Sequence, residues 1–300
     1  MIGKILIAGG TGLVGSNLLK LLKQKKYEVI ILTTQQNKAN GIDLLYWNPM
    51  KNELPTNELK EIEYCINLCG KGIFDENFTS SRKKELLESR TIPIQCLMDF
   101  FSTQSRFKGF VSATAIGIYP NTCLTILDEH STKGKGFVAD LVQTWEDTIK
   151  HYESPNYTTC TLRLGIVLSN QGGFLAKLSK PIRYFMGAIP GSGKQYVSWI
   201  HIDDLCQMFI HAIENKLNGT FNAVAPTPNT LGNISKQIAK KLKRPSLMPH
   251  IPVFVLKLLF GEERHELLLT DQQVNSDKIQ STGFKFIYHS SEQAITQLLK

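Results

Sequence analysis

The sequence lacks several features that would place it in a special class of protein. No apolar run among its 300 residues is long enough to cross a bilayer, and no internal repeat or low-complexity segment is evident. The amino terminus has only a short apolar run, Ile5 to Ala8, which meets glycine at once and therefore lacks the longer apolar region of a secretory signal. These absences predict a cytoplasmic protein that has no membrane span.

Cysteine is sparse, and its spacing argues against a cysteine-based metal site. Of the six cysteines, Cys65 and Cys69 are spaced C-x3-C and lack a second pair, so we expect reduced thiols. His201, Asp203 and Asp204 in "SWIHIDDL" also resemble metal ligands. Because this segment precedes an expected helix, its carboxylates would cap free N–H groups there, and we predict no metal site.

Positive charge is in excess but is not arranged as a nucleic-acid module. Lysine and arginine exceed aspartate and glutamate by 34 to 26, in segments such as "RKKE" and "KQIAKKLKR". This pattern favours a solvated basic surface and no nucleic-acid partner, and it is compatible with anionic ligands. The most apolar segment, Pro252 to Gly261, is either a packed domain helix or an interface or surface anchor.

The first half of the chain alternates between strand-like and helix-like segments. Apolar strand-like runs fall at residues 4–8, 28–34, 43–47, 63–68 and 109–114, and a sixth fits residues 158–168. Helix-like runs at residues 14–25, 80–104 and 138–152 lie between them. Such alternation is typical of a parallel sheet covered on both faces. The predicted fold class is therefore α/β, a Rossmann-type doubly wound parallel sheet.

The alternation ends after Leu168. The segments "SNQGG" and "PGSGK" have loop composition, and the rest is mainly helical with prolines between the segments. We predict a Rossmann domain over residues 1–168 and a smaller, mainly helical substrate-side region over residues 169–300. Strand signals at "YVSWIH" and "GTFNAV" indicate that segments near residues 196–224 return to the first domain.

Three glycines between the first strand and the first helix indicate a dinucleotide site. Gly9 would allow a tight turn, Gly12 would let the backbone approach a pyrophosphate, and Gly15 would let the helix pack closely. The end of the second strand, "LTTQQNK", has neither the acid typical of NAD sites nor the arginine typical of NADP sites. Thr33, Thr34 and Lys38 are the candidates there, and they leave the choice between NAD(H) and NADP(H) open.

The glycine pattern, with "INLCGKGI", "VSATAIGIYP", "TWEDTI", "LRLGIVLSNQGG", "GSGKQYVSWIHIDDL" and "FNAVAPTP", resembles the extended and atypical short-chain dehydrogenase/reductases. The subgroup it resembles most is the epimerase family, also described as sugar-nucleotide-epimerase-like, which has its own carboxy-terminal region. The resemblance implies NAD(P)(H) binding and slightly favours NADP(H), although Thr34 stands where members often have arginine. It carries cofactor roles onto Gly9, Gly12, Leu13, Val14, Gly15, Thr33, Leu68, Cys69 and Gly70.

The catalytic pair of that superfamily, a tyrosine four residues before a lysine, is missing. None of the nine tyrosines has lysine at the fourth following position, and the expected helix reads "GFVADLVQTWED". The resemblance places Thr114 where a hydroxyl polarises the substrate carbonyl. Tyr119, Lys71 or water would then move the proton. Each residue also has a structural alternative: a strand-end threonine, a packing tyrosine and a solvated loop lysine.

Two hypotheses for the function follow. The first is an NAD(P)-dependent oxidoreductase or epimerase-like enzyme for a small polar substrate, whose phosphate or carboxylate would contact Arg82 and Arg90. These arginines could instead only cap local structure. The second is a catalytically inactive dinucleotide-binding sensor or scaffold. A homodimer is compatible with either hypothesis.

Overall fold

The computed structural model describes residues 3–35, 43–245 and 247–299, so the candidate Lys38 lies outside the described residues. Its central feature is a seven-stranded parallel sheet in the order β12-β7-β5-β4-β1-β2-β3. The strands are β1 (Lys4–Ala8), β2 (Glu28–Thr33), β3 (Leu44–Tyr46), β4 (Tyr64–Asn67), β5 (Gly109–Ala115), β7 (Thr158–Leu164) and β12 (Gly219–Ala223).

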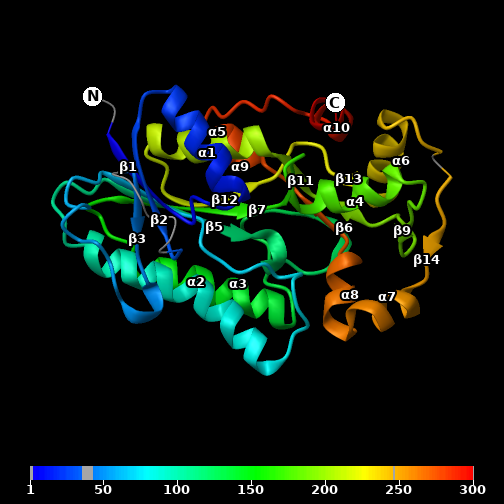
Figure 1. Ribbon diagram of the computed structural model, residues 1–300, viewed down its shortest axis with the longest axis horizontal. Coiled ribbons are helices and arrows are strands. Elements are labelled where there is room, and N and C mark those ends of the chain that lie inside the picture. Colours follow the sequence, from blue (N-terminus) through cyan, green and yellow to red (C-terminus); the bar gives the residue numbers. More distant parts are fainter. Residues whose placement is uncertain (1–2, 36–42, 246, 300) are drawn as a thin grey trace.

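Helices cover both faces of this sheet (Figure 1). On one face α1 (Leu13–Gln24) packs against α5 (Ile202–Glu214), and on the other α2 (Ser80–Phe101) packs against α3 (Phe137–His151). The strands between them are apolar on both sides because both of their faces are buried. This architecture confirms the predicted α/β doubly wound fold.

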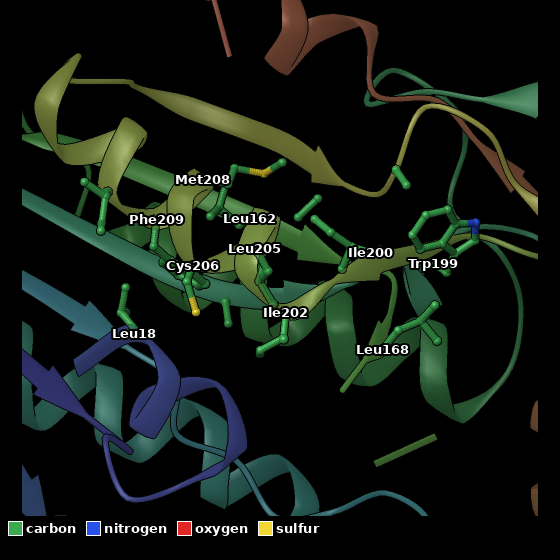
Figure 2. Close-up of a cluster of buried hydrophobic side chains, with 14 of the residues drawn as sticks. Leu18, Leu162, Leu168, Trp199, Ile200, Ile202, Leu205, Cys206, Met208 and Phe209 are labelled. Atoms are coloured by element: carbon green, nitrogen blue, oxygen red, sulfur yellow. The ribbon is translucent and has the colours of Figure 1, made fainter. Parts of the chain in front are cut away.

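Two large apolar clusters hold the layers together. The cluster of the α1 and α5 face includes Leu18, Leu162, Trp199, Leu205 and Phe209, which are labelled in Figure 2. The cluster of the α2 and α3 face is built around other strand residues and the buried side chains of those two helices. A fully buried side chain of this size contributes about 1.5–3 kcal/mol to folding relative to an exposed one. The two clusters therefore stabilise the packing of the helices on the two faces of the sheet.

The prediction of a single strand over residues 158–168 is wrong, because this segment forms two strands. β7 ends at Leu164, and β8 (Ile166–Leu168) pairs with β11 (Trp199–His201) in a separate two-stranded sheet. Gly165 lies at the break, where its N–H donates to the carbonyl of Ala223 and a Cβ would come within 2.5 Å of the Ser198 carbonyl oxygen. The chain therefore changes partners at a glycine.

The carboxy-terminal half of the chain adds helices and short strands around one end of the sheet (Figure 1). The strand β6 (Thr122–Leu127), which the sequence pattern did not indicate, pairs with β15 from that half. No described helix is long and apolar enough to cross a membrane, and the five cysteines with described side chains are free thiols. The further elements are α4 (Gly173–Arg183), β9 (Ile189–Pro190), β10 (Tyr196–Val197), β13 (Asn229–Thr230), α6 (Leu231–Lys241), β14 (His250–Ile251), α7 (Val253–Phe260), α8 (Glu262–Leu268), β15 (Gln272–Val274), α9 (Asp277–Ser281), α10 (Ser291–Leu298) and the 3-10 turns Pro49–Lys51 and Ile116–Ile118.

Candidate functional site

The sheet order reverses between β1 and β4, and the loops that leave these strands form the candidate site. In open parallel sheets ligands bind outside the carboxyl ends of the strands at such a switch point. The Leu68 N–H donates to the Ala8 carbonyl at 2.9 Å, so the two strand ends are held side by side. The predicted cofactor residues of both loops are thus brought together at this point of the fold.

The three glycines of the first loop have distinct structural reasons to be glycine. Gly9 has φ +80°, and a Cβ there would lie 2.8 Å from the Leu68 carbonyl. A Cβ on Gly15 would lie 2.5 Å from the Cα of Gly10, so the helix can approach the loop only without a side chain. Gly12 is different, because its Cβ would meet nothing nearer than 3.4 Å and the residue is exposed.

The helix α1 begins directly after Gly12, which is exposed to solvent. Gly12 is the N-cap and supplies no side-chain cap, and the first turn carries no acidic residue. The loop before α4 borders this turn: Asn17 Nδ2 donates to Gln171 Oε1 at 3.2 Å, and a Cβ on Gly173 would lie 3.4 Å from the Leu13 side chain. Free N–H groups and the positive helix end attract phosphate, so this surface is suited to a pyrophosphate.

The end of β2 separates the two threonine candidates. Thr33 is buried, and its hydroxyl accepts a hydrogen bond from the Gln35 N–H at 3.1 Å. Thr34 is exposed at the same strand end. Of the two hydroxyls, only that of Thr34 is open to an adenosine ribose or its phosphate.

The loop after β4 is tied into the sheet by a buried amide. Asn67 Nδ2 donates to Ser112 Oγ at 3.1 Å, and Asn67 Oδ1 accepts from the Cys69 N–H at 3.2 Å. Burial raises the pKa of the Cys69 thiol to about 12, so this thiol stays protonated at neutral pH. Leu68, Cys69 and Gly70 therefore present a fixed backbone beside the glycine loop.

Arg82 and Arg90, the candidates for substrate binding, are both buried and directed at the loop after Gly70. Arg82 donates to the Gly72 carbonyl at 2.8 Å, and Arg90 donates to the Lys71 carbonyl at 2.9 Å. The exposed ammonium of Lys71 pairs with Glu85, which also pairs with Arg82. In this arrangement both guanidinium groups hold the loop, and the Lys71 charge is shared with a carboxylate.

Thr114 lies in a buried polar network with four other side chains. Its hydroxyl is 3.1 Å from Glu146 Oε1, and Arg163 binds both oxygens of Glu146 at 2.8 and 2.6 Å. A carboxylate only accepts, so the Thr114 hydroxyl donates its proton to Glu146. The other contacts of Arg163 extend the network to Tyr119 and Asn222.

Tyr119 is enclosed in the same network. Its hydroxyl accepts from Arg163 at 2.8 Å and donates to Asn222 Oδ1 at 2.7 Å, and only 3% of the residue is exposed. Burial raises the pKa of Tyr119 to about 12, against the smaller opposing effect of Arg163. Transfer of this proton to a substrate would require the hydrogen bond donated to Asn222 to break.

The helix α3 has apolar side chains around the positions expected for the catalytic pair. Val138 packs against Gly117, where a Cβ would lie 2.8 Å from Val138 Cγ1. Val142 is buried in an apolar cluster with Ile116 and Ile118. No relay of tyrosine and lysine can form on this surface.

The network contains three residues that sequence reasoning did not propose for the site: Glu146, Arg163 and Asn222. A signal was present for Arg163, because a charged residue in the middle of a buried apolar strand must have a partner. Nothing in the sequence indicated Asn222, which is far along the chain on β12.

The metal-like cluster in "SWIHIDDL" has hydrogen-bonding roles. His201 caps α5 by accepting from the Asp203 N–H at 3.0 Å, and its ring stacks on Tyr288. Asp204 accepts from the N–H groups of Ile287 and Tyr288 at 2.8 and 3.1 Å. These residues pin the carboxy-terminal segment to α5.

A doubly wound parallel sheet with a glycine loop at its switch point defines a Rossmann-type α/β protein. The chain belongs to the NAD dependent epimerase/dehydratase family, whose model matches residues 5–223. A second model, a domain of unknown function termed DUF1731, matches residues 251–298. The recognition of the epimerase family from the sequence is thereby confirmed.

Relatives and solved structures agree with this assignment. An epimerase family protein of Staphylococcus aureus is 32% identical over 98% of both chains, and one of Mycobacterium leprae is 28% identical over 97% of this chain and 94% of its own. The human epimerase family protein SDR39U1, solved with NADPH, is 26% identical, covers 99% of both chains and has a TM-score of 0.88. UDP-glucose 4-epimerase of Thermotoga maritima, at 14% identity over 99% of this chain and 97% of its own and a TM-score of 0.81, shares the fold.

Proposed function

We propose that this protein binds NADP(H) or NAD(H) at the glycine loop and uses it in reversible hydride transfer to a small polar substrate. The observation that carries the proposal is the open, uncapped start of α1 at Gly12, beside the fixed loop after β4. The bound nicotinamide would supply the hydride acceptor or donor. NADP(H) is the preferred form because the human relative was solved with NADPH.

The substrate class follows from the neighbours and from the loops. Several solved structures of the same fold carry UDP-sugars, so a sugar nucleotide is the first class to test. The first turn of α4 has no acidic residue and borders the first turn of α1. The positive end of α4 would therefore favour binding of the diphosphate of such a substrate. Lys71, Arg82 and Arg90 would contribute to this positive region chiefly by holding its loop.

Thr114 would contact the reacting oxygen as a hydrogen-bond acceptor. Its own proton is directed to Glu146, so its free lone pairs suit a substrate hydroxyl better than a carbonyl. The proposed chemistry therefore starts from the alcohol form of the substrate, and the proton leaves through water or Lys71. Tyr119 would support this site by holding Arg163 in place.

A second candidate function is supported by the apolar surface of α3. Because Val138 and Val142 lie where the catalytic pair is expected, the chain would bind the dinucleotide as a sensor or scaffold without turnover. The two candidates share the cofactor site and differ only in whether Thr114 acts on a substrate.

Cofactor binding is tested by Gly12→Ala. The added methyl fits the fold at 3.4 Å from Gly9 O but projects where a pyrophosphate would approach, so we expect NADPH affinity to fall at least tenfold, about 1.4 kcal/mol. Titration calorimetry measures the affinity, and urea unfolding checks that stability changes by about 1 kcal/mol or less. Unchanged NADPH affinity in a folded Gly12→Ala protein would refute the proposed site.

Turnover separates the two candidates. Wild-type protein and Thr114→Val are incubated with NADP⁺ and a panel of UDP-sugars and small polar alcohols, and nicotinamide absorbance is followed. Turnover that falls about 100-fold in Thr114→Val while NADPH binding is kept supports the enzyme. Tight NADPH binding without any turnover across the panel supports the sensor or scaffold.

A further inference from the structure

The end of the molecule that carries α4, α6 and α7 displays large apolar side chains that the proposed function does not use. On α7, Val253, Phe254, Leu258 and Leu259 are between 49% and 84% exposed, and Leu256 is the only fully buried described residue of this helix. A helix that is apolar on all sides is normally covered by something. Monomeric soluble proteins seldom leave such surface open without a function.

A second group of exposed apolar residues lies in the same part of the fold. Tyr184, Phe185 and Met186 follow α4 and are exposed by more than 60%, and Leu247 is 95% exposed. Phe185 stacks under Arg244, and β9 pairs with β14, so the segments before and after these strands adjoin. β14 leads directly into α7 at the same end of the molecule (Figure 1). We refer to these two groups of residues as the apolar end.

The charge around the apolar end has one sign. Residues 173–194 and 231–261, which contain α4, β9, α6, β14 and α7, have no aspartate or glutamate. Lysine and arginine together number four in the first segment and six in the second, and these ten exceed the net charge of +8 of the whole chain. The positive excess that looked dispersed in the sequence is therefore concentrated by the fold. These cations are Lys177, Lys180, Arg183, Lys194, Lys236, Lys240, Lys241, Lys243, Arg244 and Lys257.

Two acidic residues near this region form ion pairs, one with a cation of the region and one with a cation outside it. Glu292 of α10 pairs with Lys240 at 3.1 Å. Glu263 of α8, which follows α7, pairs with Lys83 of α2 at 2.6 Å. The net charge of the segments around the apolar end therefore stays positive when Glu292 and Glu263 are included.

We infer that the apolar end docks on an anionic phospholipid surface. The Phe254, Leu258 and Leu247 side chains would enter the interfacial region, and the surrounding cations would contact lipid headgroups. Stable attachment of a protein without a span needs two such signals, apolar insertion and a basic patch, and both are present here. Of the two alternatives for Pro252 to Gly261, this inference takes the surface anchor.

Two features favour a lipid surface over a protein partner. Side chains exposed by 65–95% project from the surface, whereas a partner helix is usually received in a groove. A second copy of the chain would meet this face through a twofold axis, which would set the cationic segments against one another. A bilayer with anionic lipid satisfies both the apolar and the charged groups.

The test is flotation of the full chain with vesicles of phosphatidylcholine alone or with added phosphatidylglycerol. We expect binding only to the anionic vesicles and release by high salt. The double variant Phe254→Ser/Leu258→Ser, and separately Lys180→Gln/Lys243→Gln, should each weaken binding at least tenfold. The matched controls Leu124→Ser and Lys60→Gln, exposed residues outside the apolar end, should bind as the wild type does.

Folding and self-association are measured on the same samples. Far-UV circular dichroism and NADPH binding report whether each variant is folded, and the lysine pair provides the result if the serine variant fails to fold. Absence of binding to anionic vesicles by the wild type overturns the inference. A wild-type dimer that Phe254→Ser/Leu258→Ser dissociates in sedimentation velocity also overturns it, because a second copy would then cover the apolar end.

Discussion

At the scale of single residues, the candidate catalytic group is part of a buried ion-pair network. Glu146 accepts from Thr114 and from two nitrogens of Arg163, and both charged side chains are nearly excluded from solvent. Removing one partner of such a pair leaves the other charge uncompensated, which costs about 3–5 kcal/mol. The network therefore fixes Thr114 and Tyr119 and also contributes to stability.

Glu146→Gln should lower the free energy of unfolding by about 3 kcal/mol, since the neutral amide cannot neutralise Arg163. Urea unfolding followed by tryptophan fluorescence measures the change. The matched control is Glu61→Gln, which removes an exposed ion pair with Arg106 and should cost less than about 1 kcal/mol. If Glu146→Gln costs no more than Glu61→Gln, the buried pair does not have the assigned role.

Single residues also show where sequence reasoning reaches its limit. Gly9, Gly12 and Gly15 could be assigned because their spacing reflects local geometry, which the strand and helix around them determine. Asn222 could not, because it meets Tyr119 through a contact 103 residues apart that depends on sheet order. The loop contacts of Arg82 and Arg90 span only 10 and 19 residues, but they too formed no pattern in the sequence.

At the scale of elements, strand and helix positions follow from hydrophobic periodicity, whereas the partner of each strand does not. The predicted strand over residues 158–168 is rich in strand-forming residues on both sides of Gly165 and gives no other sign of a break. The break exists because β8 leaves the main sheet to pair with β11. Partner exchange is a property of the assembled fold, so the sequence marks the position only by a glycine.

Gly165→Ala should therefore destabilise the fold more than an alanine at an unconstrained glycine. The new Cβ would lie 2.5 Å from the Ser198 carbonyl oxygen, and a backbone atom cannot move aside without loss of the β8–β11 pairing. We expect a loss of about 1–3 kcal/mol in urea unfolding. Gly70→Ala, whose Cβ would meet only the flexible Arg90 side chain at 3.4 Å, is the control and should be nearly neutral. Equal losses in the two variants would contradict the assigned role of Gly165.

At the scale of the whole molecule, the carboxy-terminal segment is anchored to the sheet layer through α5. Asp204 binds two backbone N–H groups of that segment, and His201 contacts both Tyr288 and Gln297. The sequence indicated that "IDDL" begins a helix but could not indicate what its acids hold, because the partners lie more than 80 residues away. The helix α5, which covers the main sheet, and the carboxy-terminal segment therefore form one interdependent structure at this point.

Burial of His201 makes this anchor sensitive to pH. Desolvation is the largest effect and lowers the pKa of His201 below its ordinary value, against the opposing charge of Asp203. In the unfolded chain the imidazole has a pKa of about 6.5, so it takes up a proton below that pH while the folded protein still resists protonation. The stabilisation is thus complete above about pH 6.5 and is lost as the pH falls from there through the lowered pKa of the folded state.

We expect the free energy of unfolding to fall on acidification below about pH 6.5 with a slope of up to about 1.4 kcal/mol per pH unit from this residue. Urea unfolding at a series of pH values measures the slope. His201→Gln should be less stable at neutral pH because the stacked cap of α5 is altered, yet its slope in this interval should be shallower. The other titrating groups contribute equally to the slopes of His201→Gln and of the wild type, so the difference between the two slopes reports His201 alone. Equal slopes would show that His201 does not couple pH to the anchoring of the carboxy-terminal segment.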